Sequence, residues 1–424
     1  MISRLKRWLY FPVARYFRFW AGIKLRRWHP RVILVTGSSG KTTLLHLLEA
    51  QIGAKAHYSH HANSAFGISF DILGLEAPED SIAKWLLATV MAPLAVFTPT
   101  HREKLYVVEA DSDRPGEAAF IASLVRPAVV IWLSSDRSHS MNFDRSVAAG
   151  RAPNVETAIA REYGHHLEQA SELVIVNGDS ELITAQLGRT KAKVISISAK
   201  QVSHYSVTPA GTKFTIDGQD YKLKALLPEE AGRSVAAVVA VCDYLKLEVD
   251  PSFGNFKLPP GRSSIFPGIK QTTLVDSSYN AIPDAVRAIL NLFDHLAAPT
   301  KWVVLGDMLE LGRSERAEHE KLAGELAKLK LDRIILVGSR QQRYTLSALK
   351  KLDPTAKVET FDEPKAALAY LQREIKGGEA ILFKGAQRLN LEGIIEHLLA
   401  NPTDVALLCR RGAIWERKRH DWGL

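Results

Sequence analysis

The stretch Val32-Ile-Leu-Val-Thr-Gly-Ser-Ser-Gly-Lys-Thr-Thr43 decides the fold of the first half of the chain. Its aliphatic and β-branched start predicts a buried strand, and the run from Leu44 to Ala50 predicts a helix. The loop between them is bracketed by Gly37 and Gly40, so that backbone N–H groups and a helix N-terminus can face an anion. Strand, loop and helix together predict a phosphate-binding loop.

Lys41 and Thr42 give this loop its chemistry. A lysine at this place reaches the β- and γ-phosphates of a nucleotide, and the hydroxyl of the next residue suits Mg²⁺. The spacing is a shortened form of G-x-x-x-x-G-K-[ST], because Val35 stands where the first glycine would be. We therefore expect ATP and Mg²⁺ as cofactors, with a β-turn before a surface helix as the alternative. The predicted nucleotide-binding residues are Gly37, Ser38, Ser39, Gly40, Lys41, Thr42 and Thr43.

The positive charge of the chain is concentrated at its N-terminus. The 424 residues carry a net charge of +9, whereas residues 1–48 contain ten Lys and Arg and no Asp or Glu. The remainder is therefore close to neutral, which argues against a nucleic-acid-binding body. The two cysteines, Cys242 and Cys409, exclude a disulfide framework and fit a reducing compartment. The length suffices for two or three domains.

Residues 1–30 form a basic arm that is rich in aromatic residues. After Pro12, which suits a helix start, an apolar stripe with helical spacing comprises Val13, Tyr16, Phe17, Trp20 and Ile23. Such a helix is typical of a membrane interface, so we predict that residues 1–28 contact the inner face of the membrane. We also predict that the protein is cytoplasmic and a monomer. The alternatives are packing against the protein's own body and contact with RNA. Arginines interrupt the arm too often for a signal peptide or a spanning helix.

Strand and helix patterns alternate along the rest of the chain. The stretch from Trp85 to Thr100 is apolar but contains two prolines, and we predict a buried helix and loop there. The linker from Asp250 to Arg262 carries three prolines and two glycines, which indicates a domain boundary. We therefore predict a central ATP-binding domain at 31–258 and a second domain at 259–424. Expected strands are 32–36, 105–109, 128–133, 173–177, 272–276, 302–306, 333–337, 357–360 and 380–383, with a small antiparallel meander at 203–225 and a helix at 231–247. Helices are expected at 283–295, 315–329, 340–350, 363–376 and 390–399.

These patterns predict an α/β protein. The first sheet is expected to be mostly parallel and covered on both faces, since its strands are continuous apolar runs. The second domain is expected to be an open, Rossmann-like α/β sheet. Within these predicted domains, several motifs occur in a consistent order and spacing, and they indicate more than the fold class.

Together these motifs resemble the Mur ligase family, and within it the D-alanyl-D-alanine-adding ligases, over roughly residues 31–400. The phosphate loop is similar to the family's short P-loop. The segment His61-Ala-Asn-Ser-Ala-Phe-Gly-Ile68 resembles the Asn-rich segment near the acceptor substrate, which implies roles for Asn63 and Ser64. Val107-Val-Glu-Ala-Asp-Ser-Asp-Arg-Pro-Gly-Glu117 resembles the strand that ends in a Mg²⁺-binding glutamate, here Glu109. A buried glutamate at a strand end would itself suit a cation, although pairing with an arginine is the alternative.

The resemblance implies further site residues. His139 follows the next strand, where the family places a histidine near a second Mg²⁺. Asp276-Ser-Ser-Tyr-Asn-Ala-Ile-Pro-Asp284 resembles a signature that approaches the nucleotide, and Pro260-Gly-Arg262 a linker arginine that reaches ATP. The segments Leu305 to Gly312 and Phe383 to Arg388 would shape the amino-acid pocket. The resemblance therefore implies nucleotide contacts from Arg262, Asp276 and Asn280, metal ligation by Thr42, Glu109 and His139, and substrate contacts from Asp307, Glu310 and Lys384.

Three departures from the family pattern stand out. No lysine occurs between Lys104 and Lys191, where family members carry a carbamylated lysine; the nearest match is Arg161. Our hypothesis is that Glu162 supplies the missing carboxylate or that Arg161 contacts an acyl phosphate. Ser277 replaces the second aspartate of an Asp-Asp pair. Only about 30 residues precede the P-loop, so we expect the N-terminal UDP-binding domain to be missing.

The resemblance implies ATP-dependent amide ligation through an acyl phosphate, in cell-wall precursor synthesis. Lys41 would offset the repulsion between a carboxylate and the γ-phosphate, with His139, Arg161 and Glu162 as further catalytic candidates. The expected partners are a muropeptide or other carboxylate and an amino acid or dipeptide. The alternatives are a ligase for a membrane-anchored acid and a non-catalytic nucleotide-binding subunit. A P-loop kinase or GTPase is disfavoured by the second α/β domain. Whether Cys409 and the basic tail after it pack on the body is left open.

Overall fold

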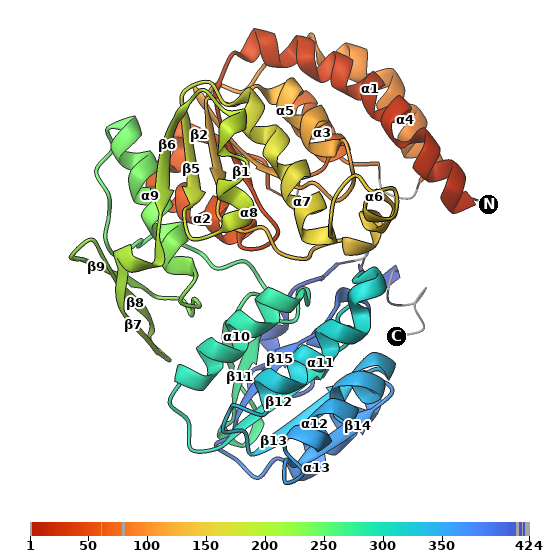
Figure 1. Cartoon of the computed structure of the whole chain (residues 1–424), viewed down its shortest axis with the longest axis vertical. Helices are drawn as coiled ribbons and strands as arrows, with labels where there is room; N and C mark the ends of the chain where they lie inside the picture. The colour runs from red at the N-terminus through yellow and green to blue at the C-terminus, as the bar shows by residue number, and fades with distance from the viewer. Residues whose placement is uncertain (1, 61, 79–80, 413–414, 418, 420–424) are drawn as a thin grey trace. The chain divides into compact units, whose positions relative to one another are not determined.

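The computed structural model describes residues 2–60, 62–78, 81–412, 415–417 and 419, with side chains from residue 9 onward (Figure 1). The chain forms two compact units, and each of them combines segments that are not consecutive in the sequence. Unit 1 comprises Met1–Asp136, Arg145–Gln201 and Arg233–Asp250, and unit 2 comprises Arg137–Asp144, Val202–Gly232 and Pro251–Leu424. The domain boundaries at 31 and 259 remain predictions.

A six-stranded parallel sheet forms the centre of unit 1. Its order is β2-β3-β1-β4-β5-β6, which agrees with the predicted mostly parallel sheet. The strands are β1 (Arg31–Thr36), β2 (Ala56–Tyr58), β3 (Leu105–Ala110), β4 (Val129–Trp132), β5 (Leu173–Asn177) and β6 (Lys193–Ile197), of which β2 and β6 were not predicted. The helices are α1 (Ile2–Trp28), α2 (Lys41–Ile52), α3 (Ala65–Leu73), α4 (Ile82–Ala95), α5 (Glu117–Val125), α7 (Val155–Tyr163), α8 (Glu181–Thr184) and α9 (Ala231–Leu245). The short α6 (Asp144–Ala148) precedes α7.

Helix α1 packs on unit 1, beside α3, α4 and α5. It contains Pro12 in its interior, so the prediction of a start there was wrong. The predicted apolar stripe was also misplaced, because the buried side consists of Ala14, Phe17, Ala21, Leu25 and Trp28. Polar contacts fix the helix as well: Tyr10 donates to the Glu117 carboxylate (2.5 Å) and Lys24 to the carbonyl of Leu73 (2.8 Å). The buried side of α1 therefore packs on the protein's own body, which was one of the alternatives for the arm.

Helix α4 lies alongside α1 (Figure 1). The prediction of a buried element from Trp85 to Thr100 was wrong, because only one side of the helix is buried, through Ala88, Ala92 and Ala95. The opposite side is apolar and exposed. Among the described residues, no helix combines the length and apolarity needed to cross a bilayer.

Unit 2 is built on a mixed sheet of order β10-β11-β15-β12-β13-β14, in which β10 alone is antiparallel to its neighbour. Successive residues of β12 alternate between two apolar clusters: Val303 and Leu305 lie in one, Trp302 and Val304 in the other. Apolar side chains therefore cover both faces of this sheet, which the sequence predicted to be an open α/β sheet. The strands are β10 (Ser264–Pro267), β11 (Thr273–Asp276), β12 (Lys301–Gly306), β13 (Arg333–Val337), β14 (Val358–Phe361) and β15 (Ala380–Lys384). The helices are α10 (Pro283–His295), α11 (Glu315–Leu326), α12 (Ser347–Leu352), α13 (Pro364–Glu374) and α14 (Glu392–Glu396), with a π-helical turn (Gln341–Leu346) before α12.

The predicted small meander is present in unit 2. It consists of β7 (Val202–Thr208), β8 (Gly211–Ile216) and β9 (Gln219–Leu223), all antiparallel. Its Val207 joins the apolar cluster that also contains Phe293 of α10. This contact explains why the meander groups with the second sheet instead of the first.

Candidate functional site

The predicted phosphate loop connects β1 to α2 and is held against the end of β4. Gly37 has φ of 134°, and a Cβ atom there would lie 2.7 Å from the Ser134 hydroxyl, so glycine is required. The Ser134 hydroxyl accepts from the amide of Ser39 (2.9 Å) and donates to its carbonyl (2.8 Å). Gly40, with φ of 75°, precedes α2, and no side chain caps that N-terminus. The first amides of α2 are therefore left to a ligand.

Lys41 lies over this loop. Its side chain is buried, its ammonium donates to the Gly37 carbonyl (2.6 Å) and forms an ion pair with Asp111 (3.3 Å). The Ser38 hydroxyl in turn contacts the Asp136 carboxylate (3.1 Å) and accepts from the Asp136 amide (2.8 Å). Side-chain contacts thus hold the loop and its lysine in position, and phosphate binding by these residues remains a prediction.

Glu109 lies next to the loop, because it pairs with Val35 in the parallel ladder between β3 and β1. Its side chain is buried, and among the described residues no hydrogen bond or ion pair involves its carboxylate. Removing an unpaired carboxylate from water is costly, whereas Mg²⁺ prefers oxygen ligands. Glu109 therefore suits a Mg²⁺ ligand, and metal ligation by Glu109 and Thr42 remains a prediction. Arginine pairing, the alternative for Glu109, is not found among the described residues.

The Asn-rich segment lies beside the loop's ion pair. The carbonyl of Asn63 accepts from the amide of Asp111 (2.8 Å), and the Ser64 side chain caps α3 by accepting from the Gly67 amide (3.1 Å). His61, which opens the motif, is outside the described residues. The backbone of the segment is thus tied to the partner of Lys41.

Arg161 and Glu162, the candidates for the missing lysine, point to different places. Both Glu162 oxygens accept backbone amides at the N-terminus of α5, from Gly116 (2.9 Å) and Ala118 (2.9 Å). Burial raises the pKa of Glu162, although these hydrogen bonds oppose the shift. Arg161 is exposed and donates to the carbonyl of Arg151. These contacts give Glu162 a structural task, and the catalytic roles remain predictions.

In unit 2, Asp276 and Lys384 end two neighbouring strands, β11 and β15. Asp276 is buried; one oxygen accepts the Ser278 amide (2.9 Å) and the other has no hydrogen-bond partner in the described part of the chain. Burial raises the pKa of Asp276. Lys384 donates to the Ser277 hydroxyl (3.3 Å), and burial, with the nearby Arg262 charge, lowers its pKa to about 7. One edge of the sheet thus carries Asp276, with an oxygen that no described group satisfies, and Lys384, whose pKa is lowered.

Arg410 fixes the loop after Asp276, and the sequence reasoning missed it. Its guanidinium donates to the carbonyls of Ser278 (2.8 Å) and Tyr279 (2.6 Å) and pairs with Glu392 inside unit 2. Cys409 lies 3.6 Å from the Ser278 hydroxyl, so the start of the basic tail packs on the body. No local motif signals this role, because the contacts span more than 130 positions along the chain.

The other predicted residues of unit 2 fall into two places. The Arg262 guanidinium lies 4.5 Å from the Tyr279 ring centre, and the Asn280 side chain accepts the Ala281 amide (2.8 Å), both near Asp276. The second place is around His139, whose Nδ1 lies 2.8 Å from the Glu310 carboxylate and lowers the pKa of that group. Asp307 caps the π-helical turn by accepting the amides of Arg340 (3.1 Å) and Gln341 (2.9 Å). Metal and substrate roles for His139, Glu310 and Asp307 remain predictions.

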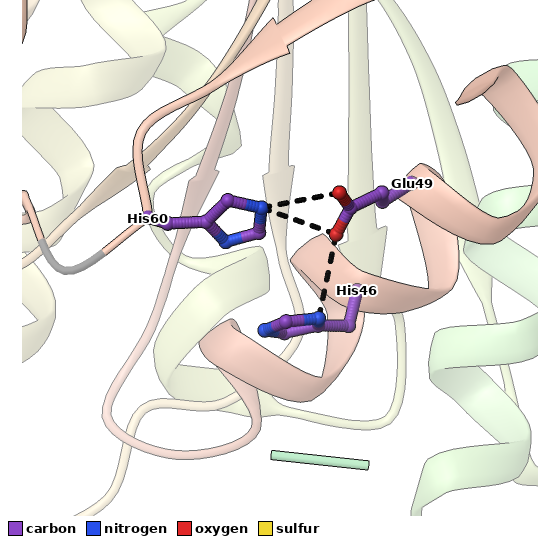
Figure 2. A group of neighbouring side chains, drawn as sticks. All are labelled: His46, Glu49 and His60. Carbon is purple, nitrogen blue, oxygen red and sulfur yellow. Dashed lines mark hydrogen bonds and ion pairs between the residues drawn. The ribbon is translucent and has the colours of Figure 1, made fainter. Parts of the chain in front are cut away.

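A separate group of side chains in unit 1 was not predicted (Figure 2). Glu49 of α2 lies between two imidazoles, with its carboxylate 3.4 Å from His46 Nδ1 and 3.1 Å from His60 Nε2. The three ligand atoms lie within 4.8 Å of one another. His46 and Glu49 share one side of α2, and His60 reaches them from the loop after β2 (Figure 2).

Known proteins match nearly the whole chain. The UDP-N-acetylmuramoyl-tripeptide--D-alanyl-D-alanine ligase of Bacillus subtilis is 24% identical over 378 residues, which cover 88% of this chain and 76% of the relative. The enzyme of that name from Escherichia coli is 25% identical over 386 residues, covering 88% and 78%.

Solved structures share the fold. The MurF ligase of Thermotoga maritima in complex with ADP superimposes with a TM-score of 0.71 at 20% identity, covering 91% of this chain and 83% of that one. Folylpolyglutamate synthase of Mycobacterium tuberculosis follows with a TM-score of 0.57 at 16% identity, covering 91% and 95%. Residues 35–231 match the family model of the Mur ligase middle domain, and residues 261–387 match that of the Mur ligase glutamate ligase domain. The chain therefore belongs to the Mur ligase family of ATP-dependent ligases.

Proposed function

We propose that this protein joins the carboxylate of a muropeptide to the amine of an amino acid or dipeptide such as D-alanyl-D-alanine, in the cytoplasm and as a monomer. The proposal rests on the predicted phosphate loop with its buried Lys41 and on the neighbouring Glu109, whose carboxylate has no partner in the part of the chain that the structure describes. The names of the relatives that match 88% of the chain support this choice of substrates.

The residues of unit 1 account for activation of the acid. Bound ATP supplies the phosphoryl group that turns the carboxylate into an acyl phosphate. The amides of α2 and the Lys41 ammonium hold negative charge in place, and Lys41 exchanges its Gly37 and Asp111 contacts for phosphate oxygens. Glu109 and Thr42 would hold Mg²⁺, which fits their oxygen chemistry.

The sheet edge of unit 2 offers groups suited to an amine or an anion. Lys384, with its pKa lowered to about 7, is partly neutral near physiological pH and takes up a proton when an anion binds beside it. One oxygen of Asp276 has no hydrogen-bond partner among the residues that the structure describes, so it can accept one from a ligand. We assign this edge, with Arg262 and Asn280, to recognition of nucleotide or substrate.

The test is phosphate release from ATP and Mg²⁺ with UDP-N-acetylmuramoyl-tripeptide and D-alanyl-D-alanine. Substrate-dependent turnover that Lys41→Ala abolishes and Lys55→Ala leaves unchanged supports the proposal, since Lys55 lies exposed beyond α2. Nucleotide binding without turnover on any acid would point instead to the non-catalytic nucleotide-binding subunit. Turnover only with a lipid-linked acid would favour the membrane-anchored substrate.

We further propose that residues 1–28 contact the inner face of the membrane while one side of α1 packs on unit 1. Phe19 remains 60% exposed, and the exposed Arg15 and Arg26 flank it at i−4 and i+7 on the same side of α1. Arginines around an exposed aromatic ring are typical of an interfacial helix. An anchored or lipid-linked acid would then be presented close to the enzyme.

A further inference from the structure

The outer face of α4 is the largest run of exposed apolar side chains on one helix of the described structure. Ile82, Leu86, Val90 and Leu94 follow at intervals of four residues, and Phe97 continues the row three residues later. These five side chains are between 54% and 79% exposed. A contiguous apolar face of this kind is typical of a docking surface, because exposing that much apolar area to water is unfavourable.

The charge around this face selects an anionic partner. Neither residues 2–28 nor residues 81–102 contain an Asp or Glu, whereas α1 keeps Arg15 and Arg26 exposed. Hydrogen bonds link α1 to α4 and to the segment after it. Tyr16 donates to the Thr89 carbonyl of α4 (2.7 Å), and Lys24 donates to the Thr98 hydroxyl just beyond the helix (3.0 Å). Helices α1 and α4 are neighbours in unit 1 (Figure 1), and we call the exposed arginines of α1 together with the outer apolar face of α4 the α1–α4 surface.

We propose that this α1–α4 surface docks on an anionic lipid bilayer, with α4 lying in the interface and the arginines of α1 at the headgroups. The proposal deepens the membrane contact proposed above, since it moves insertion from α1 to α4. The five residues of the α4 row enter the acyl boundary, where exposed apolar area is removed from water. Arg15 and Arg26 add attraction to anionic headgroups.

Flotation of the full chain with vesicles tests the proposal. Vesicles of phosphatidylcholine alone are compared with vesicles that contain about a quarter phosphatidylglycerol. Wild-type protein is expected to float with the anionic vesicles, and Leu86→Glu/Val90→Glu to stay in the unbound fraction. Arg15→Gln/Arg26→Gln should bind anionic vesicles about 25-fold more weakly than wild type, since each basic residue contributes roughly fivefold.

A matched control uses apolar side chains with similar exposure in unit 2. Leu352→Glu/Leu407→Glu changes two leucines that are each 58% exposed, and this variant should float like wild type. Wild-type protein that fails to float overturns the proposal. So does a wild-type dimer that Leu86→Glu/Val90→Glu converts to a monomer without any flotation, because the surface then joins two copies. Ligase turnover with a soluble substrate is unaffected by these variants, so failure of the proposed reaction is a separate result.

The His46, Glu49 and His60 group carries a second, independent inference. Tetrahedral Zn²⁺ with ligand bonds of about 2.0–2.2 Å places ligand atoms roughly 3.3 Å apart. The carboxylate-to-imidazole distances of 3.4 and 3.1 Å are close to this spacing, and all three ligand atoms lie within 4.8 Å of one another. Tyr58 stacks on the His60 ring with centres 5.9 Å apart, which restrains its orientation.

We propose that these three side chains bind a divalent transition metal such as Zn²⁺, with water in the remaining position. Two imidazoles and one carboxylate form a ligand set that Zn²⁺ accepts, and three protein ligands leave the site open. The chain also provides a comparison without a second imidazole. His165 lies 3.1 Å from Glu168 at the same i, i+3 spacing and with similar exposure, but Arg189 is the third partner.

Competition with a chromophoric chelator measures Zn²⁺ affinity of the full chain, with excess Mg²⁺ present to fill the nucleotide-associated site. One equivalent of Zn²⁺ should bind to wild type, and His60→Ala should weaken binding at least about tenfold. His165→Ala should bind like wild type. Equal affinity in wild type and His60→Ala, or an equal loss in His165→Ala, would overturn the metal site.

Discussion

Lys384→Met removes a buried ammonium from the edge of the second sheet while keeping the length of the side chain. The pKa of Lys384 is lowered to about 7 from its ordinary 10.5. Between these values the unfolded chain holds a proton at this position that the folded chain has released. The free energy of unfolding contributed by this group therefore rises with pH from about 7 to 10.5, at roughly 1.4 kcal/mol per pH unit.

The magnitude follows from the same two values. Below pH 7 both states carry the charge, and its burial costs the folded state on the order of 4 to 5 kcal/mol. Above pH 10.5 neither state carries it and the cost is gone. We expect Lys384→Met to be more stable than wild type at pH 7, and the advantage to shrink steadily towards pH 10.

The assay is urea unfolding of wild type and variant at several pH values between 7 and 10. Because a chain with two compact units need not unfold in one step, local hydrogen exchange of β15 identifies the transition that contains Lys384. Taking the difference between variant and wild type cancels the other titrating groups. Lys351→Met, which changes an exposed lysine of α12, should show no such trend. A Lys384→Met difference that stays constant with pH would refute the lowered pKa.

Three more predictions follow from the contacts described. Lys41→Ala should abolish the rise in melting temperature that ADP and Mg²⁺ produce, while the protein without nucleotide stays folded; an undiminished rise would contradict the phosphate-loop assignment. Glu162→Ala should lower the free energy of unfolding by about 1–3 kcal/mol because two amides at α5 lose their acceptor, whereas loss of turnover in a stable Glu162→Gln would restore its catalytic role. Arg410→Met should cost about 3–5 kcal/mol by leaving Glu392 charged and unpaired, and Arg410→Met/Glu392→Leu should recover much of that loss; equal melting temperatures of all three proteins would show that the pair is dispensable.

The sheets could be predicted because their strands are continuous apolar runs between glycine and proline signals. β5, β13 and α10 have the predicted bounds, and α10 begins at Pro283, where proline fits the first helical turn. β6 was missed because the strand is mostly exposed and ends the sheet, so its sequence carries little hydrophobic signal. Apolar periodicity predicts elements with a buried face, and it does not detect a strand that is held mainly by backbone pairing.

The same rule explains the errors in α1 and α4. The large aromatic residues of α1 suggested the apolar stripe, but the side that packs contains Ala14 and Ala21, whose small side chains allow close approach to unit 1. In α4 the alanines are again buried and the larger residues face outward. Hydrophobicity alone would bury the larger apolar residues of α4, so the pattern misplaced the buried side of this helix.

The site shows a different limit. The places of Lys41, Glu109 and Asp276 follow from local sequence. Glu109 and Asp276 lie at the ends of strands whose positions the pattern predicts, and Lys41 begins the helix after the glycine-bracketed loop. The sequence suggested a catalytic role for Glu162 and a substrate contact for Asp307, yet each carboxylate accepts two backbone amides at the start of a helical segment from elsewhere in the chain. Whether a buried carboxylate serves a ligand or a helix depends on which amides reach it, and that is decided by tertiary packing. Glu109, which no amide or cation of the described chain satisfies through its side chain, is therefore the stronger candidate for a metal.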